Sequence, residues 1–121
     1  MKVTIGKEFS FEAAHQLPQQ EVYGACQNLH GHRYELTVEV TGEVNELGWI
    51  CNFKELKDIV KADVIEQYDH SNLNQYFPLP TVENMALHIF QVLAKEFEKK
   101  SLALNRIVLY ETETSYAEVR A

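Results

Sequence analysis

Three histidines and one cysteine in the first third of the chain are residue types that bind metal ions and transfer protons. Cys26, His30 and His32 lie within "CQNLHGH", and His15 ends the stretch "FSFEAAH". His30 and His32 are two residues apart, so on a strand both imidazoles point to the same face. Three neutral imidazoles with an open fourth position form the ligand set of a catalytic zinc. The pattern predicts a zinc site made by His15, His30 and His32.

Cys26 precedes His30 by four residues, in a stretch that also holds Gly24 and Gly31. Three roles are open to it: a fourth zinc ligand, a thiol that fills space, or a base or nucleophile. A neighbouring metal charge lowers the pKa of a thiol, which favours the third role. Cys51 lies beside Ile50 in an apolar stretch, and we expect it in the core.

Two further positions carry groups suited to proton transfer or ligand binding. Asp69 and His70 are adjacent, and a carboxylate that orients an imidazole makes a proton relay, although a solvated loop pair is the simpler interpretation. Glu111 falls on the apolar face of an expected strand, where an unpaired charge is costly. It therefore needs a partner: either a salt bridge or a planar ligand that offers two parallel N–H donors.

The elements that must position these groups follow from hydrophobic periodicity. Odd positions from 3 to 13 are apolar except Lys7, and His15 ends the same face. Even positions from 30 to 40 begin with His30 and His32 and continue with apolar residues, so both stretches read as strands. Residues 41–48 are an expected turn region. A short strand is expected at 49–51, and a loop at 69–80 because of its polar and proline content.

Two helices and a hairpin complete the expected elements. Asn52 caps a first helix that fades near Tyr68, and Thr81 caps a second helix whose apolar face starts at Val82. His88 belongs on the outer face of that second helix. Residues 106–113 and 115–121 read as paired strands. The order ββααββ predicts an α+β fold: one domain over 1–121, with a four-stranded antiparallel sheet and two helices on one face.

Composition restricts the partners and the compartment. The formal net charge of −7 argues against nucleic acid or anionic lipid as a main partner, although it allows a small anionic ligand. No apolar run is long enough for a membrane span, and the start of the chain has no continuous apolar region of the signal-peptide type. The two cysteines do not form a disulfide framework, so we expect a cytoplasmic protein.

Five segments together are similar to one known family. They are "FSFEAAH" (9–15), "C-x-x-x-H-G-H" (26–32), "DHSNLN" (69–74), "PTVEN" (80–84) and "YETETSYAEV" (110–119). In this order, they resemble the 6-pyruvoyltetrahydropterin synthase superfamily. The nearest branch is the 6-carboxytetrahydropterin synthases of queuosine biosynthesis, because the animal-type synthases have a longer segment between the cysteine and the histidines.

The resemblance implies a T-fold, with subunits joined into barrels in a homohexamer of two stacked trimers. It implies zinc on His15, His30 and His32, and Cys26 as the base that abstracts a proton. The remaining roles it implies are a proton relay by Asp69 and His70, and a double role for Glu111, which anchors the pterin ring and joins the relay. The implied reaction converts 7,8-dihydroneopterin triphosphate to 6-carboxytetrahydropterin, acetaldehyde and triphosphate.

Three positions depart from the family pattern, and two other functions stay open. Asn52 replaces an aspartate, Ala25 replaces a basic residue, and Arg33 replaces a small polar one; Arg33 either meets the triphosphate or lies on the solvent face. One alternative function is 6-pyruvoyltetrahydropterin synthesis, which removes triphosphate without cleaving the side chain. The other is a pterin-binding module without turnover.

Overall fold

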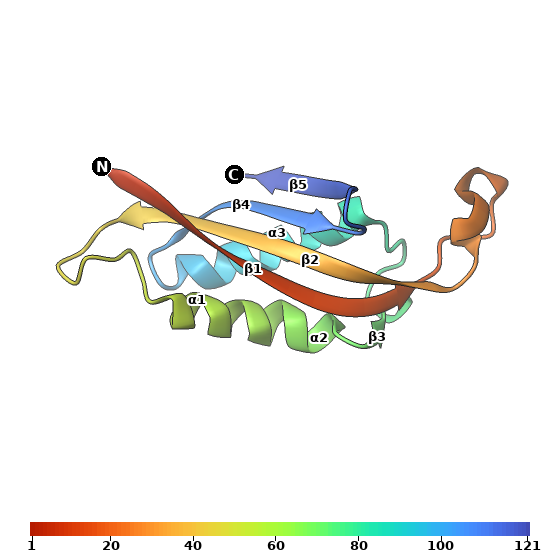
Figure 1. Ribbon diagram of the computed structural model, residues 1–121, viewed down its shortest axis with the longest axis horizontal. Coiled ribbons are helices and arrows are strands. Elements are labelled where there is room, and N and C mark those ends of the chain that lie inside the picture. Colours follow the sequence, from red (N-terminus) through yellow and green to blue (C-terminus); the bar gives the residue numbers. More distant parts are fainter.

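The computed structural model describes residues 1–121 as a mixed α+β fold built on a five-stranded sheet in the order β3-β1-β2-β4-β5. Figure 1 shows the long strands β1 and β2 crossing the length of the molecule, with α1 and α2 below them and α3 behind them. The strands are β1 (Lys2–His15), β2 (His30–Glu43), β3 (Ser71–Asn72), β4 (Ala103–Tyr110) and β5 (Tyr116–Arg120). The α-helices are α1 (Phe53–Val60), α2 (Glu66–Tyr68) and α3 (Val82–Glu98).

Three further helical segments join these elements. A π-helical turn, η2 (Lys61–Ile65), makes α1 and α2 continuous, so the first helix ends at Tyr68 as the sequence predicts. The 3₁₀ segments are η1 (Glu21–Gln27), between β1 and β2, and η3 (Leu73–Gln75), after β3. In Figure 1 the connection that contains η1 projects beyond the end of the sheet.

The antiparallel pairing of β1 with β2 brings the predicted ligands together. Its register places His15 opposite His30 and Ala13 opposite His32. Since neighbouring strands in a sheet lie about 5 Å apart, this register puts all three imidazoles at one end of one face. The prediction that His15, His30 and His32 share the apolar face is confirmed.

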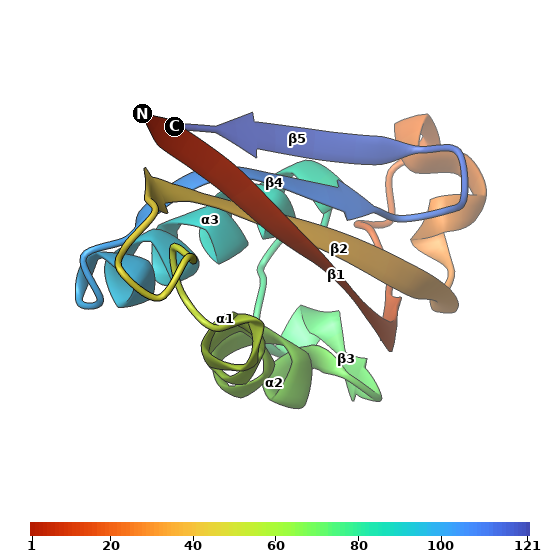
Figure 2. The ribbon, with the colours of Figure 1, turned by 60° about the vertical axis from the view of Figure 1, so that its left-hand side comes forward.

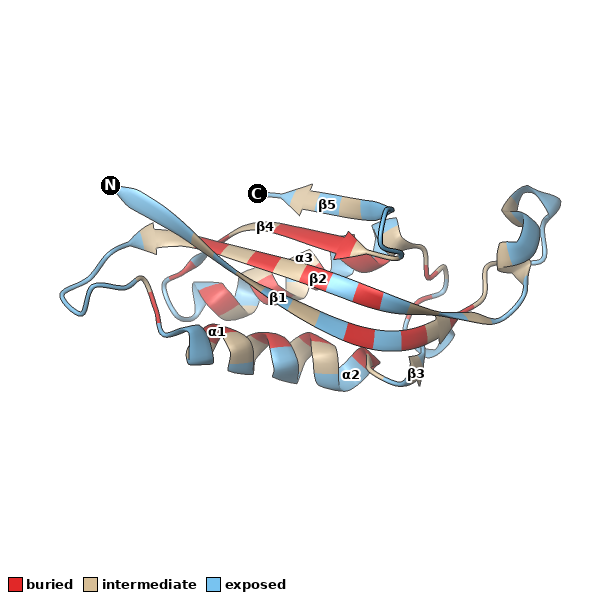
Figure 3. Cartoon of the chain, viewed as in Figure 1, coloured by how far each residue is buried: buried red, intermediate tan, exposed pale blue.

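The helices cover one face of the sheet, as Figure 2 shows. A cluster of 22 buried apolar residues lies between the two layers. Figure 3 shows the alternation that produces it, with buried positions recurring along β1 and β2 and on the inner sides of the helices. From α3 it takes Met85, Ile89, Leu93 and Phe97, which the sequence predicts for that face. Cys51 is buried as expected, and His88 is exposed.

Both predicted helix caps are present. The side chain of Asn52 accepts a hydrogen bond from Lys54 N–H, so the asparagine found in place of aspartate still caps α1. The side chain of Thr81 accepts one from Asn84 N–H at the start of α3. Each side chain satisfies a helix N–H group that has no partner within the helix.

Several expected boundaries are wrong. The sheet has five strands instead of four, because Ser71 and Asn72 of the expected loop pair in parallel with Ala13 and Ala14. Residues 49–51 form bends and not a strand, and the carbonyl of Trp49 accepts the N–H of nearby Asn45 in a local turn. β2 extends to Glu43, and β4 occupies Ala103–Tyr110 instead of 106–113. No helix is long and apolar enough to cross a membrane.

Candidate metal and pterin site

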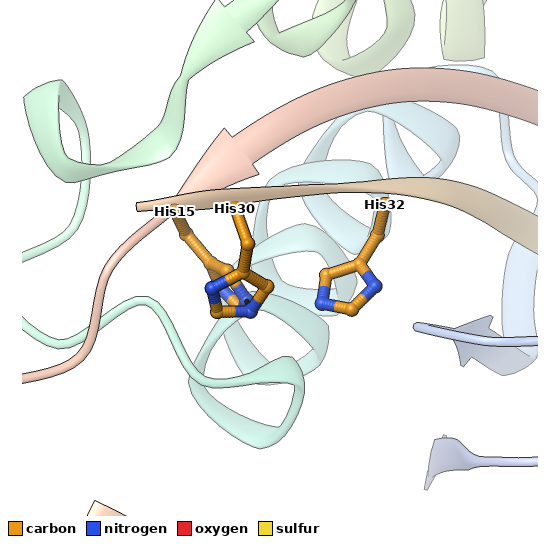
Figure 4. Close-up of side chains that lie close together, drawn as sticks. All are labelled: His15, His30 and His32. Atoms are coloured by element: carbon orange, nitrogen blue, oxygen red, sulfur yellow. Dashed lines mark hydrogen bonds between the residues drawn. The ribbon is translucent and has the colours of Figure 1, made fainter. Parts of the chain in front are cut away.

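The three histidines converge on one point. Their ligand atoms lie within 4.8 Å of one another, and the Nε2 atoms of His15 and His30 are 3.0 Å apart. Figure 4 shows the imidazoles projecting from the same side of the β1–β2 pair, toward α3. His15 is 1% exposed, whereas His30 and His32 are partly exposed. A ligand can therefore approach from the side of His30 and His32.

In two of the imidazoles, those of His15 and His30, the Nδ1 atom is hydrogen-bonded to a backbone carbonyl. His15 Nδ1 lies 2.7 Å from the carbonyl oxygen of Pro80, and His30 Nδ1 lies 2.7 Å from that of Asn28. A carbonyl oxygen only accepts, so both Nδ1 atoms carry hydrogen. In the neutral rings both Nε2 lone pairs then face each other, an arrangement that a cation between them stabilises. Metal-binding histidines typically have their second nitrogen bound in this way.

His32 completes this donor set. Its Nε2 is buried and has no hydrogen-bond partner, and Oε1 of Glu111 lies 3.2 Å away without hydrogen-bond geometry. Burial lowers the pKa of His32, and the negative charge of Glu111 only partly offsets this effect. A neutral imidazole with an unpartnered buried nitrogen is suited to a metal ion. The three residues therefore fit a zinc ion with a coordination position left for substrate.

Glu111 lies at the edge of this group. It follows the last residue of β4, at the start of the β4–β5 turn, and its N–H donates to the carbonyl of Ser115 at the end of that turn. The expectation that it lies within the strand is wrong, but its carboxylate still reaches the site, 4.0 Å from His15 Nε2. The carboxylate is partly exposed, so it remains available to a ligand.

Asp69 and His70 form a pair apart from the histidine site. His70 Nδ1 lies 3.0 Å from Asp69 Oδ2, and the other carboxylate oxygen accepts Glu12 N–H at 2.9 Å. The Glu12 N–H group, followed by His70, lowers the pKa of Asp69. His70 has φ of 58°, a left-handed conformation that costs a non-glycine residue about 1–2 kcal/mol. Its N–H donates to Glu12 O, which holds this conformation in place.

His70 borders a depression of about 540 Å³ that is lined by His32 as well as by Glu12, Gly31 and Arg33. Glu12 and Arg33 alternate with the ligands along β1 and β2, so their side chains lie on the face of the sheet opposite the three imidazoles. Arg33 thus lies on the face opposite the ligands, where its guanidinium approaches Ser10 Oγ at 3.4 Å. No hydrogen bond or ion pair joins Asp69 or His70 to the three histidines.

Cys26 lies in η1, and its thiol is not part of the metal-binding group. Its carbonyl accepts Leu17 N–H at 2.8 Å, which attaches η1 to the chain just after β1. Gly24 has φ of 55° and ψ of −131°, a backbone conformation that only glycine adopts without strain, and it permits the sharp bend before Cys26. Ala25 in the same segment is exposed.

The sequence does not reveal the groups that hold the imidazoles. Pro80 and Asn28 act through backbone carbonyls, which no residue type indicates. Tyr34, which is fully buried, places its hydroxyl 3.4 Å from His15 Nδ1, and burial raises its pKa so that it stays neutral. Its position two residues after His32 on the same strand face is the one signal that could have identified it.

Comparison with known proteins identifies the family. The sequence profile of 6-pyruvoyl tetrahydropterin synthase matches residues 4–121. A 6-carboxy-5,6,7,8-tetrahydropterin synthase of Synechocystis is 40% identical over 120 residues, covering 93% of this chain and 89% of the relative. A dihydroneopterin monophosphate aldolase of Pyrococcus furiosus is 37% identical over 111 residues, covering 92% of this chain and 91% of the relative.

A solved structure gives the same result for the fold. The 6-pyruvoyl tetrahydropterin synthase of Caenorhabditis elegans superposes with a TM-score of 0.88 at 28% identity, covering 100% of this chain and 96% of the other. The T-fold is confirmed, with one short strand more than expected. The chain belongs to the 6-pyruvoyl tetrahydropterin synthase family.

Proposed function

We propose that the chain is a zinc-dependent lyase of the 6-carboxytetrahydropterin synthase type. Its reaction would convert 7,8-dihydroneopterin triphosphate and water to 6-carboxytetrahydropterin, acetaldehyde and triphosphate, in queuosine biosynthesis. The observation that carries the proposal is the convergence of His15, His30 and His32 beside the carboxylate of Glu111. The relatives named 6-carboxy-5,6,7,8-tetrahydropterin synthase supply the reaction class.

Each site residue would have a distinct role in this reaction. A zinc ion bound by the three histidines would supply Lewis-acid polarisation of the side-chain oxygens of the pterin. Glu111 would accept two N–H groups from the edge of the pterin ring and so orient the side chain toward the histidines. Cys26, as a thiolate, would remove a proton from that side chain, and His70, held by Asp69, would exchange the other protons.

The separation of Asp69 and His70 from the histidines bears on assembly. No hydrogen bond or ion pair joins this pair to the histidines of its own chain, and of those histidines only His32 lines the same depression as His70. In addition, β3 pairs with only two residues of β1, which leaves the rest of that edge and the outer edge of β5 open. We propose a closed homo-oligomer, a hexamer of two trimers, in which the relay pair serves the site of another copy.

Two related reactions compete with this function. 6-Pyruvoyltetrahydropterin synthesis would release triphosphate and leave the side chain intact. An aldolase activity on dihydroneopterin monophosphate is favoured by the similarity to the Pyrococcus furiosus relative, which carries that name. Both reactions would use the same metal site.

Product analysis discriminates between these functions. Zinc-loaded protein is incubated separately with dihydroneopterin triphosphate and dihydroneopterin monophosphate, and the pterins and aldehydes are identified by mass spectrometry. The proposal requires 6-carboxytetrahydropterin and acetaldehyde in equal amounts from the triphosphate. A pyruvoyl product without aldehyde, cleavage of the monophosphate alone, or binding without turnover would each replace it with the corresponding alternative.

A further inference from the structure

A side-chain amide outside the predicted site binds the backbone at the end of β1. Asn74 Oδ1 accepts Gln16 N–H at 2.9 Å, and Asn74 Nδ2 donates to Gln16 O at 2.9 Å. One side chain thus satisfies both backbone groups of one residue, as a neighbouring strand would. β3 ends two residues earlier, at Asn72, so Asn74 continues its pairing with β1 beyond the end of the strand.

Gln16 lies between two functional parts of the chain. Before it is His15, the most deeply buried of the three proposed metal ligands. After it is Leu17, whose N–H donates to the carbonyl of Cys26 at 2.8 Å. The amide of Asn74 therefore binds the residue that directly follows the proposed ligand His15. That same residue precedes Leu17, whose hydrogen bond leads to the proposed base, Cys26.

The segment that carries Cys26 has few other anchors. None of the residues in η1 is buried. The hydrogen bonds of Gln19 and Gln27 side chains join parts of this segment to one another and not to the sheet. At its end it runs through Asn28, whose carbonyl binds His30 Nδ1, into β2. On the β1 side, the Leu17–Cys26 hydrogen bond attaches it to the backbone next to Gln16.

Asn74 is itself held in place. Its N–H donates to Asn72 Oδ1 at 3.0 Å, which caps η3, and the preceding Leu73 is fully buried. The segment of Asn74 begins at Asp69 and His70, which bind the backbone of Glu12. The span from Asp69 to Asn74 is therefore attached to β1 at both ends, and the amide is presented from a fixed backbone.

We propose that Asn74 is a positioning residue, whose amide fixes the Cys26 segment relative to the His15 side of the metal site. It would act on catalysis through Gln16 and Leu17 without contacting substrate. Its effect on turnover rests on the proposed function, whereas its effect on backbone protection and thiol access does not. A residue that only stabilised the fold would change the melting temperature and leave the folded site unaltered.

Two variants and one control test this proposal. Asn74→Ala removes both hydrogen bonds. Asn74→Asp has the same shape and keeps the acceptor for Gln16 N–H, but at neutral pH it cannot donate to Gln16 O. Gln75→Ala is the matched control, since Gln75 is an exposed neighbour in η3 whose side chain makes no hydrogen bond.

Three measurements are made on each folded, zinc-loaded variant below its melting temperature. Hydrogen exchange reports on the amides of Gln16 and Leu17. Alkylation by iodoacetamide, followed by peptide mass spectrometry, separates Cys26 from the buried Cys51. Steady-state kinetics give kcat and KM separately.

With Asn74→Ala we expect about tenfold faster exchange of both amides, the factor that corresponds to losing one or two ordinary hydrogen bonds. Alkylation of Cys26 should accelerate severalfold, and kcat should fall by about tenfold or more with a smaller change in KM. Asn74→Asp should keep the Gln16 amide protected and still accelerate alkylation, so the proposal can be tested even if the alanine variant does not fold.

The proposal is overturned if the Asn74 variants match Gln75→Ala in Leu17 exchange and Cys26 alkylation, whatever their melting temperatures. If the wild-type protein has no turnover with either pterin phosphate, the proposed function fails. Exchange and alkylation then still decide the role of Asn74.

Discussion

The Nε2 atoms of His15 and His30 face each other at 3.0 Å, while the Nδ1 atom of each ring donates to a backbone carbonyl. This relationship fixes both rings in the tautomer that binds metal through Nε2. It also makes the metal-free site unfavourable, because two lone pairs meet without a proton or cation between them. The site is thus prepared for a metal ion by hydrogen bonds that residue types alone do not reveal.

Zinc should bind at about one ion per chain, the stoichiometry of a single three-histidine site. His30→Ala should lose metal and turnover together, because two imidazoles hold zinc weakly. His88→Ala is the matched control: His88 is an exposed histidine on α3, away from the metal-binding group, and the variant should keep its zinc. Elemental analysis after dialysis provides the measurement, and equal zinc in both variants would contradict the assignment.

The metal-free protein should lose stability as the pH falls below the pKa of an ordinary histidine side chain. Burial lowers the pKa of His32 from 6.5, so the unfolded chain binds its proton at a higher pH than the folded one. The resulting stabilisation is complete above about pH 6.5 and is lost as the pH falls through the lowered pKa. Urea unfolding of the metal-free protein at several pH values tests this. His32→Gln should flatten the dependence, and an unchanged slope would exclude His32 as its source.

Much of this site could be predicted because strands impose a period of two. The spacing of His30 and His32, in phase with the apolar face, places both imidazoles on one side. Glu111 was identified by its residue type among apolar neighbours, although it lies just beyond the strand. The capping residues Asn52 and Thr81 were identified because their side chains act locally.

The remaining features depend on contacts distant in sequence. β3 has only two residues, Ser71 and Asn72, and its polar composition is that of a loop until Ala13 and Ala14 provide a partner. The carbonyl of Pro80 binds His15 across 65 residues of chain. Neither contact has a periodic signal, so single-sequence reasoning could not place them.

Glu111→Gln should retain zinc but bind pterin more weakly. The carboxylate is not one of the three metal-binding residues, and an amide cannot accept two parallel N–H bonds as a carboxylate does. We expect the affinity for a non-reacting pterin to fall by about tenfold or more, since hydrogen bonds to charged groups contribute about 1.5–3 kcal/mol. Isothermal titration of zinc-loaded protein measures this. Glu113→Gln, at an exposed position of the same turn, is the control and should bind normally.

Assembly into a closed oligomer should be detectable at micromolar concentration. The open edges of β1 and β5 are the structural reason, because an unpaired strand edge invites pairing with another chain. Light scattering should report a mass near six times 14.0 kDa. Proline at the exposed Glu8 of the β1 edge should reduce the oligomer, whereas Glu8→Ala should not. A monomeric wild-type protein would contradict the prediction.

Cys26→Ala separates metal binding from proton transfer. If Cys26 is the base, the variant should keep its zinc and bind pterin, yet lose turnover by about 10²–10⁴-fold, the usual contribution of general-base catalysis. Its thiol lies outside the three-histidine group, which favours this outcome over a role as fourth ligand. The decisive measurement is the zinc content of Cys26→Ala and His30→Ala after dialysis against a mild chelator. Equal loss from both variants would make Cys26 a ligand, and the proposed role of its thiolate as the base would then be wrong.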